Sequence, residues 1–158
     1  MDDAPLGSAA TRERTGDAAR ETGQPGAEVH RQAPRILVVD DDPVCCRLMA
    51  DVLERAGYAV EWTTAATVAM ERVAARCCSL VVSDVNMPHM LGTELAAEVA
   101  KLDPRLRILL VSAFADRRTQ AEARALDAML LAKPIRAEVL LAAVNALLGA
   151  PAQEEAAP

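Results

Sequence analysis

Four short apolar runs of the chain each end at a side chain that could do chemistry. In chain order, these ends carry Asp40, Asp41 and Asp42, then Asp84, then Ser112 and finally Lys133. If the runs are parallel strands of one sheet, their carboxyl ends meet at one edge and the side chains converge there. Carboxylates that lie close together repel one another unless a positive charge sits among them. The sequence therefore predicts a pocket of carboxylates with one hydroxyl and one ammonium group.

A hard divalent cation is the natural partner of such a pocket. Mg²⁺ takes oxygen ligands, usually one or two carboxylates together with waters and phosphate oxygens. Asp41 and Asp84 can supply the carboxylates, and Asn86 can supply a main-chain carbonyl. Lys133 offers a mobile charge and Ser112 a hydroxyl donor to phosphoryl oxygens. These groups suit phosphoryl transfer, in which Asp84 is placed to act as nucleophile and become an acyl phosphate.

Each of these features also has a plainer interpretation. Asp40 to Asp42 could only cap a helix, the segment "MPHMLG" could be a simple turn, and Lys133–Pro134 could lie in an ordinary loop. The functional interpretation is favoured because all of these features fall at predicted strand ends and in chain order.

Strand and helix patterns alternate along the middle of the chain. Aliphatic and β-branched runs predict strands at residues 35–39, 58–62, 79–83, 107–112 and 128–132. Amphipathic stretches predict one helix from Pro43, capped by Asp42 and stopped by Gly57, and others at residues 65–76, 92–102, 116–126 and 136–149. This alternation predicts an α/β fold with a doubly wound five-stranded parallel sheet covered on both faces.

The helical period also marks candidate core residues in the first two predicted helices. They are Val44, Leu48, Val52 and Leu53 in the first, and Val68, Met70 and Val73 in the second. We expect these side chains to face the sheet.

Length and composition restrict the remaining possibilities. The chain has 158 residues and a net charge of −6, with no basic stripe, which argues against nucleic acid as the main partner. It has no apolar run long enough to span a membrane and no signal-peptide pattern, so a soluble cytoplasmic protein is expected. Residues 1–34 and 150–158 lack apolar periodicity and are predicted to be disordered tails around one domain, 35–149.

The four cysteines form two adjacent pairs, Cys45–Cys46 and Cys77–Cys78. Neighbouring side chains on a helix or strand point apart, which disfavours a shared metal or redox site. The favoured interpretation is that they are small buried hydrophobes in a reducing cytosol.

Four motifs together make residues 34–149 similar to the receiver domain of two-component response regulators. They are "ILVVDDDP", "LVVSDVNMPHMLG", "ILLVSA" and "LLAKPI". The resemblance implies a flavodoxin-like fold with strand order 2-1-3-4-5 and a role in phosphorelay signal transduction. It also implies that Asp84 is the phosphoacceptor and takes a phosphoryl group from a phosphohistidine. The donor would be a sensor histidine kinase or a histidine phosphotransfer protein.

The resemblance gives each remaining residue of the pocket a role. Asp41 would ligate Mg²⁺, Asp40 would help through a bound water, and Asn86 would ligate through its main-chain carbonyl. Ser112 would bond the phosphoryl group and shift toward it, and Lys133 would form an ion pair with it. The peptide bond before Pro134 is often cis in this family.

Three positions depart from the family pattern. Leu130 stands where many receivers carry a Tyr or Phe that rotates inward on activation, which calls aromatic switching into question. Leu91 replaces a frequent Asp, which affects loop hydrogen bonding and not the chemistry. Ser112 replaces the commoner Thr, a conservative change. Asn86 and Phe114 occupy positions that tune phosphate lifetime in the family.

We therefore interpret the chain as a stand-alone receiver that is not an enzyme beyond assisting its own phosphorylation and dephosphorylation. Phosphorylation of Asp84 is expected to alter the surface of the last two strands and last two helices, which a downstream target protein reads. One alternative is a receiver-like scaffold that accepts no phosphate. Another is a small Mg²⁺-dependent phosphatase with an aspartyl nucleophile, which is disfavoured because Asn86 holds the place of the usual second Asp.

Overall fold

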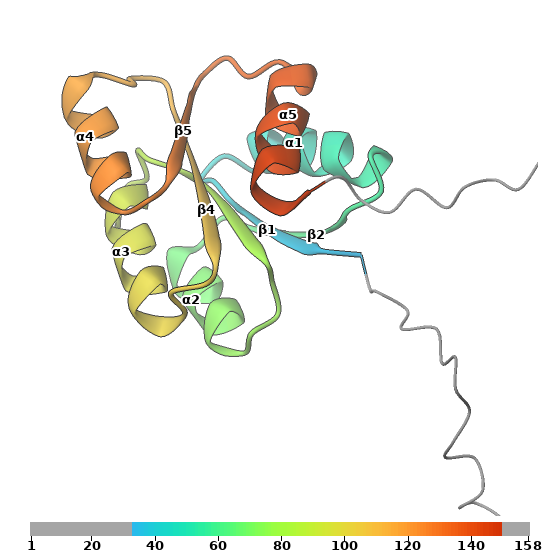
Figure 1. The fold of residues 1–158 in the computed structure, drawn as a ribbon, viewed down its shortest axis with the longest axis horizontal. Coiled ribbons are helices and arrows are strands. Elements are labelled where there is room, and N and C mark those ends of the chain that lie inside the picture. The colour runs from blue at the N-terminus through green and yellow to red at the C-terminus, as the bar shows by residue number, and fades with distance from the viewer. Residues whose placement is uncertain (1–32, 150–158) are drawn as a thin grey trace, which may run out of the picture. The chain divides into compact units, whose positions relative to one another are not determined.

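The computed structural model describes residues 33–149, which form one parallel sheet between two layers of helices (Figure 1). Within these residues the strands are β1 (Arg35–Val39), β2 (Ala59–Thr63), β3 (Leu80–Asp84), β4 (Arg107–Ser112) and β5 (Met129–Ala132). The helices are α1 (Pro43–Arg55), α2 (Ala66–Ala74), α3 (Gly92–Leu102), α4 (Arg117–Ala125) and α5 (Ala137–Leu148). The predicted tails, 1–34 and 150–158, lie outside the described residues except for Ala33 and Pro34.

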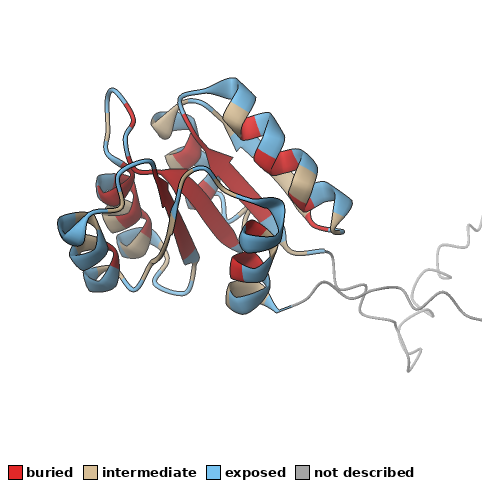
Figure 2. Cartoon of the chain, turned by 90° about the horizontal axis from the view of Figure 1, so that it is seen from above, coloured by how far each residue is buried: buried red, intermediate tan, exposed pale blue. Residues whose placement is uncertain are grey.

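All strands pair in parallel, and their order is β2-β1-β3-β4-β5, which confirms the predicted fold. The central strands β1 and β3 are almost wholly buried (Figure 2), because α1 and α5 cover one face while α2, α3 and α4 cover the other. In the part of the chain that the structure describes, no helix combines the length and apolar character that a membrane crossing requires.

The observed element boundaries lie within two residues of the predicted ones, and one difference matters for the site. Strand β3 continues through Asp84, whereas the sequence pattern ends it at Ser83. Asp84 pairs in register with Val111 of β4, so its backbone belongs to the hydrogen-bonded ladder. The candidate phosphoacceptor is therefore held by the sheet and not by a loop.

The prediction that Val44 and Leu48 are core residues is wrong, because each is 61% exposed. The side chains that α1 buries are Cys46, Met49, Ala50 and Leu53. At about 100° per residue, these four form one stripe, and Val44 and Leu48 lie on the opposite side of the helix. Val68 of α2 is likewise exposed, and α2 buries Ala69 and Val73.

The four cysteines are free thiols, and Cys46 is the fully buried one. Its thiol contacts the main-chain carbonyl of Asp40 at 3.3 Å, so it supports the end of β1. Burial raises the pKa of Cys46 and of Cys78 to about 11, which keeps both thiols protonated and weakly nucleophilic. The prediction of buried, inert cysteines holds for Cys46, whereas Cys45, Cys77 and Cys78 are half-buried.

Tyr58 joins the entry of β2 to the end of α5. Its ring is buried, and its hydroxyl hydrogen-bonds to the Asn145 side chain and lies 3.2 Å from the Gly149 carbonyl oxygen. We expect Tyr58→Phe to lower the free energy of unfolding by about 1 kcal/mol, because it leaves these acceptors unpaired. Urea denaturation followed by circular dichroism measures the change. Trp62→Phe, at a half-exposed position on β2, is the control, and equal midpoints for the two variants would contradict this role.

Candidate functional site

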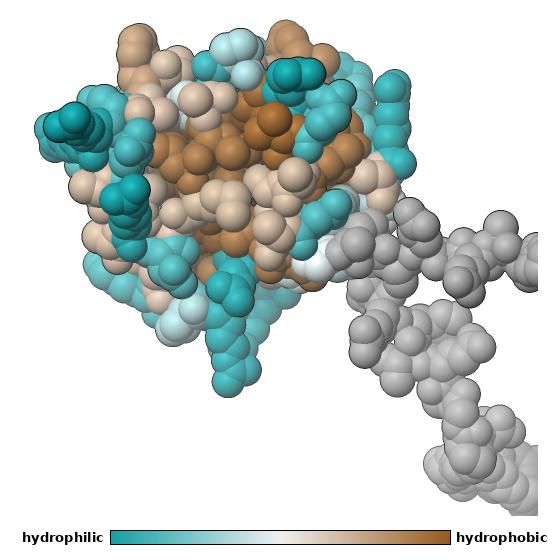
Figure 3. All heavy atoms as spheres, turned by 45° about the horizontal axis from the view of Figure 1, so that its top comes forward, coloured by the Kyte–Doolittle hydropathy of each residue, from teal (hydrophilic) through white to brown (hydrophobic). Residues whose placement is uncertain are grey.

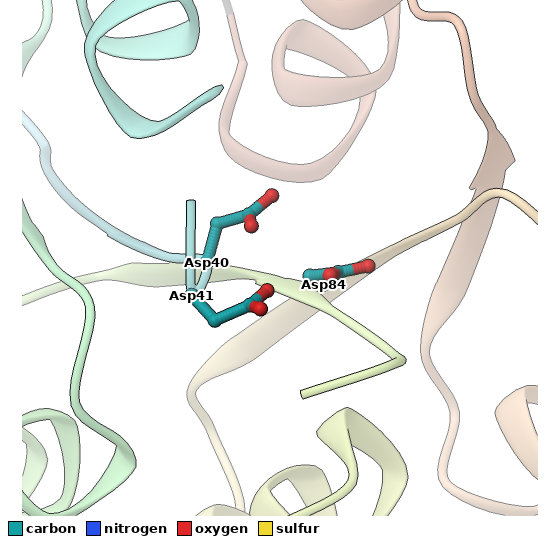
Figure 4. Close-up of side chains that lie close together, drawn as sticks. All are labelled: Asp40, Asp41 and Asp84. Atoms are coloured by element: carbon teal, nitrogen blue, oxygen red, sulfur yellow. The ribbon is translucent and has the colours of Figure 1, made fainter. Parts of the chain in front are cut away.

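Three carboxylates meet at the carboxyl edge of the sheet. Asp40 and Asp41 follow β1, Asp84 ends the neighbouring β3, and the three side chains lie close together (Figure 4). One oxygen from each carboxylate lies within 4.8 Å of the other two. Asp40 and Asp84 are 1% and 5% exposed, whereas Asp41 faces solvent. The predicted convergence of these acids is therefore present.

Asp40 is held by groups of the protein itself. One of its carboxylate oxygens accepts the Asp42 N–H at 3.0 Å, and the other accepts the Lys133 ammonium at 2.9 Å. Asp42 in turn caps α1 by accepting the Val44 N–H at 2.9 Å, as predicted. Since both oxygens of Asp40 are engaged, the exposed Asp41 is the acid better placed to meet an incoming cation directly.

Lys133 is the positive group that the sequence places in this pocket. Its ammonium lies 2.9 Å from an Asp40 oxygen and 3.6 Å from an Asp84 oxygen. Its main-chain N–H donates to the Ser112 carbonyl at 2.8 Å, and the Lys133–Pro134 peptide bond is cis, as expected. Burial acts to lower the pKa of Lys133, but the hydrogen bond and charge of Asp40 outweigh it and raise that pKa. The ammonium is therefore charged at neutral pH.

The environment of Asp84 opposes its ionisation. Burial raises the pKa of its carboxyl, and the charge of Asp40 raises it further, although Lys133 and the Asn86 N–H act in the opposite direction. Three carboxylates share one ammonium, so the pocket carries more negative than positive charge. A divalent cation would relieve this imbalance, and the all-oxygen donor set fits a hard cation such as Mg²⁺.

Ser112 and Asn86 complete the pocket. Ser112 is buried at the end of β4, and its hydroxyl oxygen accepts the Asn86 side-chain N–H at 3.3 Å and the Phe114 main-chain N–H at 3.0 Å. With two donors directed at its oxygen, the Ser112 hydroxyl keeps its own proton to donate to an arriving anion. The Asn86 N–H lies 3.4 Å from an Asp84 oxygen, which places the Asn86 backbone beside the acids.

Gly92, at the start of α3, is a residue of the site that the sequence reasoning missed. A Cβ atom there would lie 2.1 Å from the Asp84 carbonyl oxygen and 2.9 Å from the Val85 Cα. The Gly92 N–H donates to the Val85 carbonyl at 2.8 Å, which closes the loop after β3. The signal in the sequence is a single Gly eight residues after Asp84, and spacing alone did not reveal this close approach.

The structure also shows the surroundings of Leu91 and Leu130, which depart from the family pattern, and of Phe114. The Leu91 N–H donates to the Glu94 side chain at 2.9 Å, so the loop before α3 is tied without an Asp at this position. Leu130 is half-buried in β5 and borders a groove of about 400 Å³ between α4 and β5. Phe114 is exposed in the loop after β4.

Comparisons with known proteins agree with this geometry. The family model described as "Response regulator receiver domain" matches residues 36–145. The chain is 34% identical to the response regulator receiver protein CpdR of Brucella abortus, over 72% of this chain and 96% of that protein. It is 31% identical to the response regulator protein TmoT of Ectopseudomonas mendocina, over 86% of this chain but 63% of that longer protein.

Solved structures show the same architecture. The chemotaxis protein CheY4 of Vibrio cholerae superposes with a TM-score of 0.69 at 28% identity, covering 73% of this chain and 99% of that one. A CheY-like receiver domain from Methanospirillum hungatei superposes with a TM-score of 0.69 at 28% identity, covering 72% of this chain and 92% of that one.

Proposed function

Because the chain belongs to the response-regulator receiver family, we propose that it accepts a phosphoryl group on Asp84 and thereby switches its affinity for a partner protein. The observation that carries this proposal is the position of Asp84, whose carboxylate faces Asp40, Asp41 and the Lys133 ammonium on the exposed edge of the sheet. The partner is a protein and not nucleic acid, in keeping with the net charge of −6. The chain acts in the cytoplasm, either alone or as part of a phosphorelay.

The proposed transfer uses only groups that the pocket holds. An Asp84 carboxylate oxygen attacks the phosphorus of a phosphohistidine, and the O–P bond forms as the P–N bond breaks. The electron pair of the broken bond returns to the imidazole nitrogen of the donor. The Lys133 ammonium and the Ser112 hydroxyl stabilise negative charge on the phosphoryl oxygens. The product is an acyl phosphate, with no diffusible product beyond the phosphate released on hydrolysis.

The acid cluster would hold Mg²⁺ through Asp41 and Asp84, with Asp40 behind them and the Asn86 carbonyl as a further ligand. When bound, the ion neutralises phosphoryl charge. Asp40 orients the Lys133 ammonium through their 2.9 Å contact.

Metal binding and phosphoryl binding can be separated by two substitutions. We expect Asp41→Asn to weaken Mg²⁺ affinity by about tenfold, or roughly 1.4 kcal/mol, because it removes an exposed ligand. Lys133→Ala should keep Mg²⁺ affinity, since a competing cation is lost, but should impair phosphorylation and signalling. Isothermal titration calorimetry with Mg²⁺ measures the first effect, and intact-protein mass after acetyl phosphate treatment measures the second. Loss of Mg²⁺ affinity in Lys133→Ala would refute the assigned role of Lys133.

The donor protein needs a docking surface beside Asp84, and an apolar one is present. We define the α1–β5 patch by Leu48 of α1 and by Pro134 and Ile135 after β5, which together with Lys133 line a hollow of about 470 Å³. Figure 3 shows that apolar residues gather on the face turned toward the viewer, with hydrophilic residues at its margins. We propose that an apolar helix face next to the donor histidine binds the α1–β5 patch, because the phosphorus must come within bonding distance of Asp84.

A charge on the α1–β5 patch should block the protein donor but not a small one. We expect Leu48→Asp to slow phosphoryl transfer from the autophosphorylated sensor kinase by tenfold or more, because it buries a carboxylate at the interface. The kinase is chosen by profiling transfer from a panel of such kinases. Labelling by acetyl phosphate should be unchanged. Leu102→Asp, at an exposed position on α3, is the matched control, and equal slowing in both variants would contradict the proposed docking site.

Incubation with acetyl phosphate and Mg²⁺, followed by intact-protein mass spectrometry, tests the proposed function. A gain of one phosphoryl group supports the switch. Catalytic turnover of phosphate esters would instead support an aspartyl phosphatase. An unmodified but folded chain would support a receiver-like scaffold.

A further inference from the structure

Phe114 is a large aromatic side chain that the site chemistry leaves unused. It is the one Phe of the chain, it lies in the loop between β4 and α4, and it is 74% exposed. Among the large hydrophobic side chains of residues 33–149 it is the most exposed. Burying such a side chain is favourable, so an apolar space within its reach would draw it out of water.

The loop that carries Phe114 is tied to the site by a main-chain hydrogen bond. The Phe114 main-chain N–H donates to the Ser112 hydroxyl oxygen at 3.0 Å, which fixes the first turn of the loop. Ser112 itself is anchored in β4, and its carbonyl accepts the Lys133 N–H at 2.8 Å. The loop is thus held by the same hydroxyl that the proposed function assigns to a phosphoryl oxygen.

A space for an aromatic ring lies beside this loop. The groove between α4 and β5 has a volume of about 400 Å³, and its lining begins at Ala115, the residue next to Phe114. Along the groove, the lining residues are Gln120, Ala123, Arg124, Ala128, Leu130 and Ala132. Alanine methyl groups line most of it, and Leu130 does not fill it. The groove is large enough for a phenyl ring, and Gln120 and Arg124 are the polar side chains of its lining.

We infer that Phe114 moves into the α4–β5 groove when Asp84 is phosphorylated, an inference that rests on the proposed function. The phosphoryl group draws the Ser112 hydroxyl toward itself, and the Phe114 N–H loses its acceptor and turns to water. The freed loop then lets the phenyl ring leave solvent and cover Leu130. Phosphorylation thus converts an open groove into a filled surface. A ligand that occupies the groove would therefore oppose phosphorylation, and phosphorylation would weaken the binding of that ligand by the same coupling free energy.

The single Phe makes this movement directly measurable. The chain is produced with 4-fluorophenylalanine, which places one ¹⁹F label at Phe114. Acetyl phosphate and Mg²⁺ are added, and the same sample is followed by intact mass and by ¹⁹F NMR with a soluble gadolinium chelate. We expect the phosphorylated chain to show a shifted resonance and at least a twofold drop in paramagnetic broadening. A mass gain with unchanged broadening overturns the inference alone, whereas no mass gain overturns the proposed function and this inference together.

Filling the groove provides the control. In Leu130→Tyr the new ring occupies the groove, so the ¹⁹F label should stay exposed after phosphorylation. Val139→Tyr adds the same side chain at an exposed position on α5, and the label should become protected as in the wild type. Ala128→Leu is a second, smaller filling substitution if Leu130→Tyr lowers the unfolding temperature. Protection that persists in a folded, phosphorylated groove-filling variant would overturn the inference.

Discussion

Asp84→Asn should abolish the gain of one phosphoryl group that acetyl phosphate and Mg²⁺ give to the wild-type chain. The amide has no anionic oxygen to attack phosphorus, and no other carboxylate of the pocket takes the same position at the end of β3. Intact-protein mass spectrometry measures the result. Asp51→Asn, at an exposed position on α1, is the matched control and should be phosphorylated normally. A full mass gain in Asp84→Asn would show that the phosphoacceptor is a residue other than Asp84.

The same substitution should stabilise the fold, which separates loss of chemistry from loss of structure. The pKa of Asp84 is raised above its ordinary value of 3.8 by burial and by Asp40. A raised carboxyl pKa means that the folded state favours the protonated form, so ionisation destabilises it as the pH rises above the unfolded pKa. We expect the unfolding temperature of Asp84→Asn, measured with a chelator present, to exceed that of the wild type by more near pH 7 than near pH 4. A lower unfolding temperature at neutral pH would contradict this view of the pocket.

Gly92→Ala adds a single methyl group but should damage both the fold and the reacting carboxylate. The added Cβ would lie 2.1 Å from the Asp84 carbonyl oxygen, so the start of α3 or the end of β3 must move. Overpacking of this kind destabilises by about 1–3 kcal/mol. A displacement of about 1 Å at the reacting carboxylate can slow the reaction on the order of 100-fold. Urea denaturation and the initial rate of acetyl phosphate labelling measure the two effects.

Gly149→Ala is the control for that experiment because its glycine is needed for a different reason. Gly149 has φ of +82°, and nothing lies within 4 Å of the position of an added Cβ. The substitution should cost about 1 kcal/mol from backbone strain and leave the labelling rate unchanged. If Gly92→Ala were phosphorylated as fast as Gly149→Ala, the contact between Gly92 and Asp84 would have no functional role.

The positions of the site residues could be predicted from the sequence because these residues lie at the ends of strands. Asp40, Asp84, Ser112 and Lys133 each follow an aliphatic run, and the parallel topology brings such ends together without further information. The pattern could not show that Lys133 pairs more closely with Asp40 than with Asp84, because side-chain distances depend on tertiary geometry. The roles of these residues in phosphoryl transfer remain predictions.

The buried face of α1 was less predictable from the sequence. Large apolar residues such as Val44 and Leu48 suggested a core face, but the stripe that faces the sheet contains Cys46 and Ala50. The helical period fits either stripe, and only packing against the rest of the fold decides which one is buried. One of the misassigned residues, Leu48, belongs to the α1–β5 patch, so the error in the core prediction falls on the proposed docking surface.

The sheet separates the two surfaces that the proposals use. The α1–β5 patch lies on the side that α1 and α5 cover, whereas the groove beside Phe114 belongs to α4 on the other side. A phosphate donor and a protein that reads the switch therefore need not exclude each other sterically. On the proposed function, we therefore expect the donor and the reading protein to be able to bind the chain at the same time, in a three-component assembly.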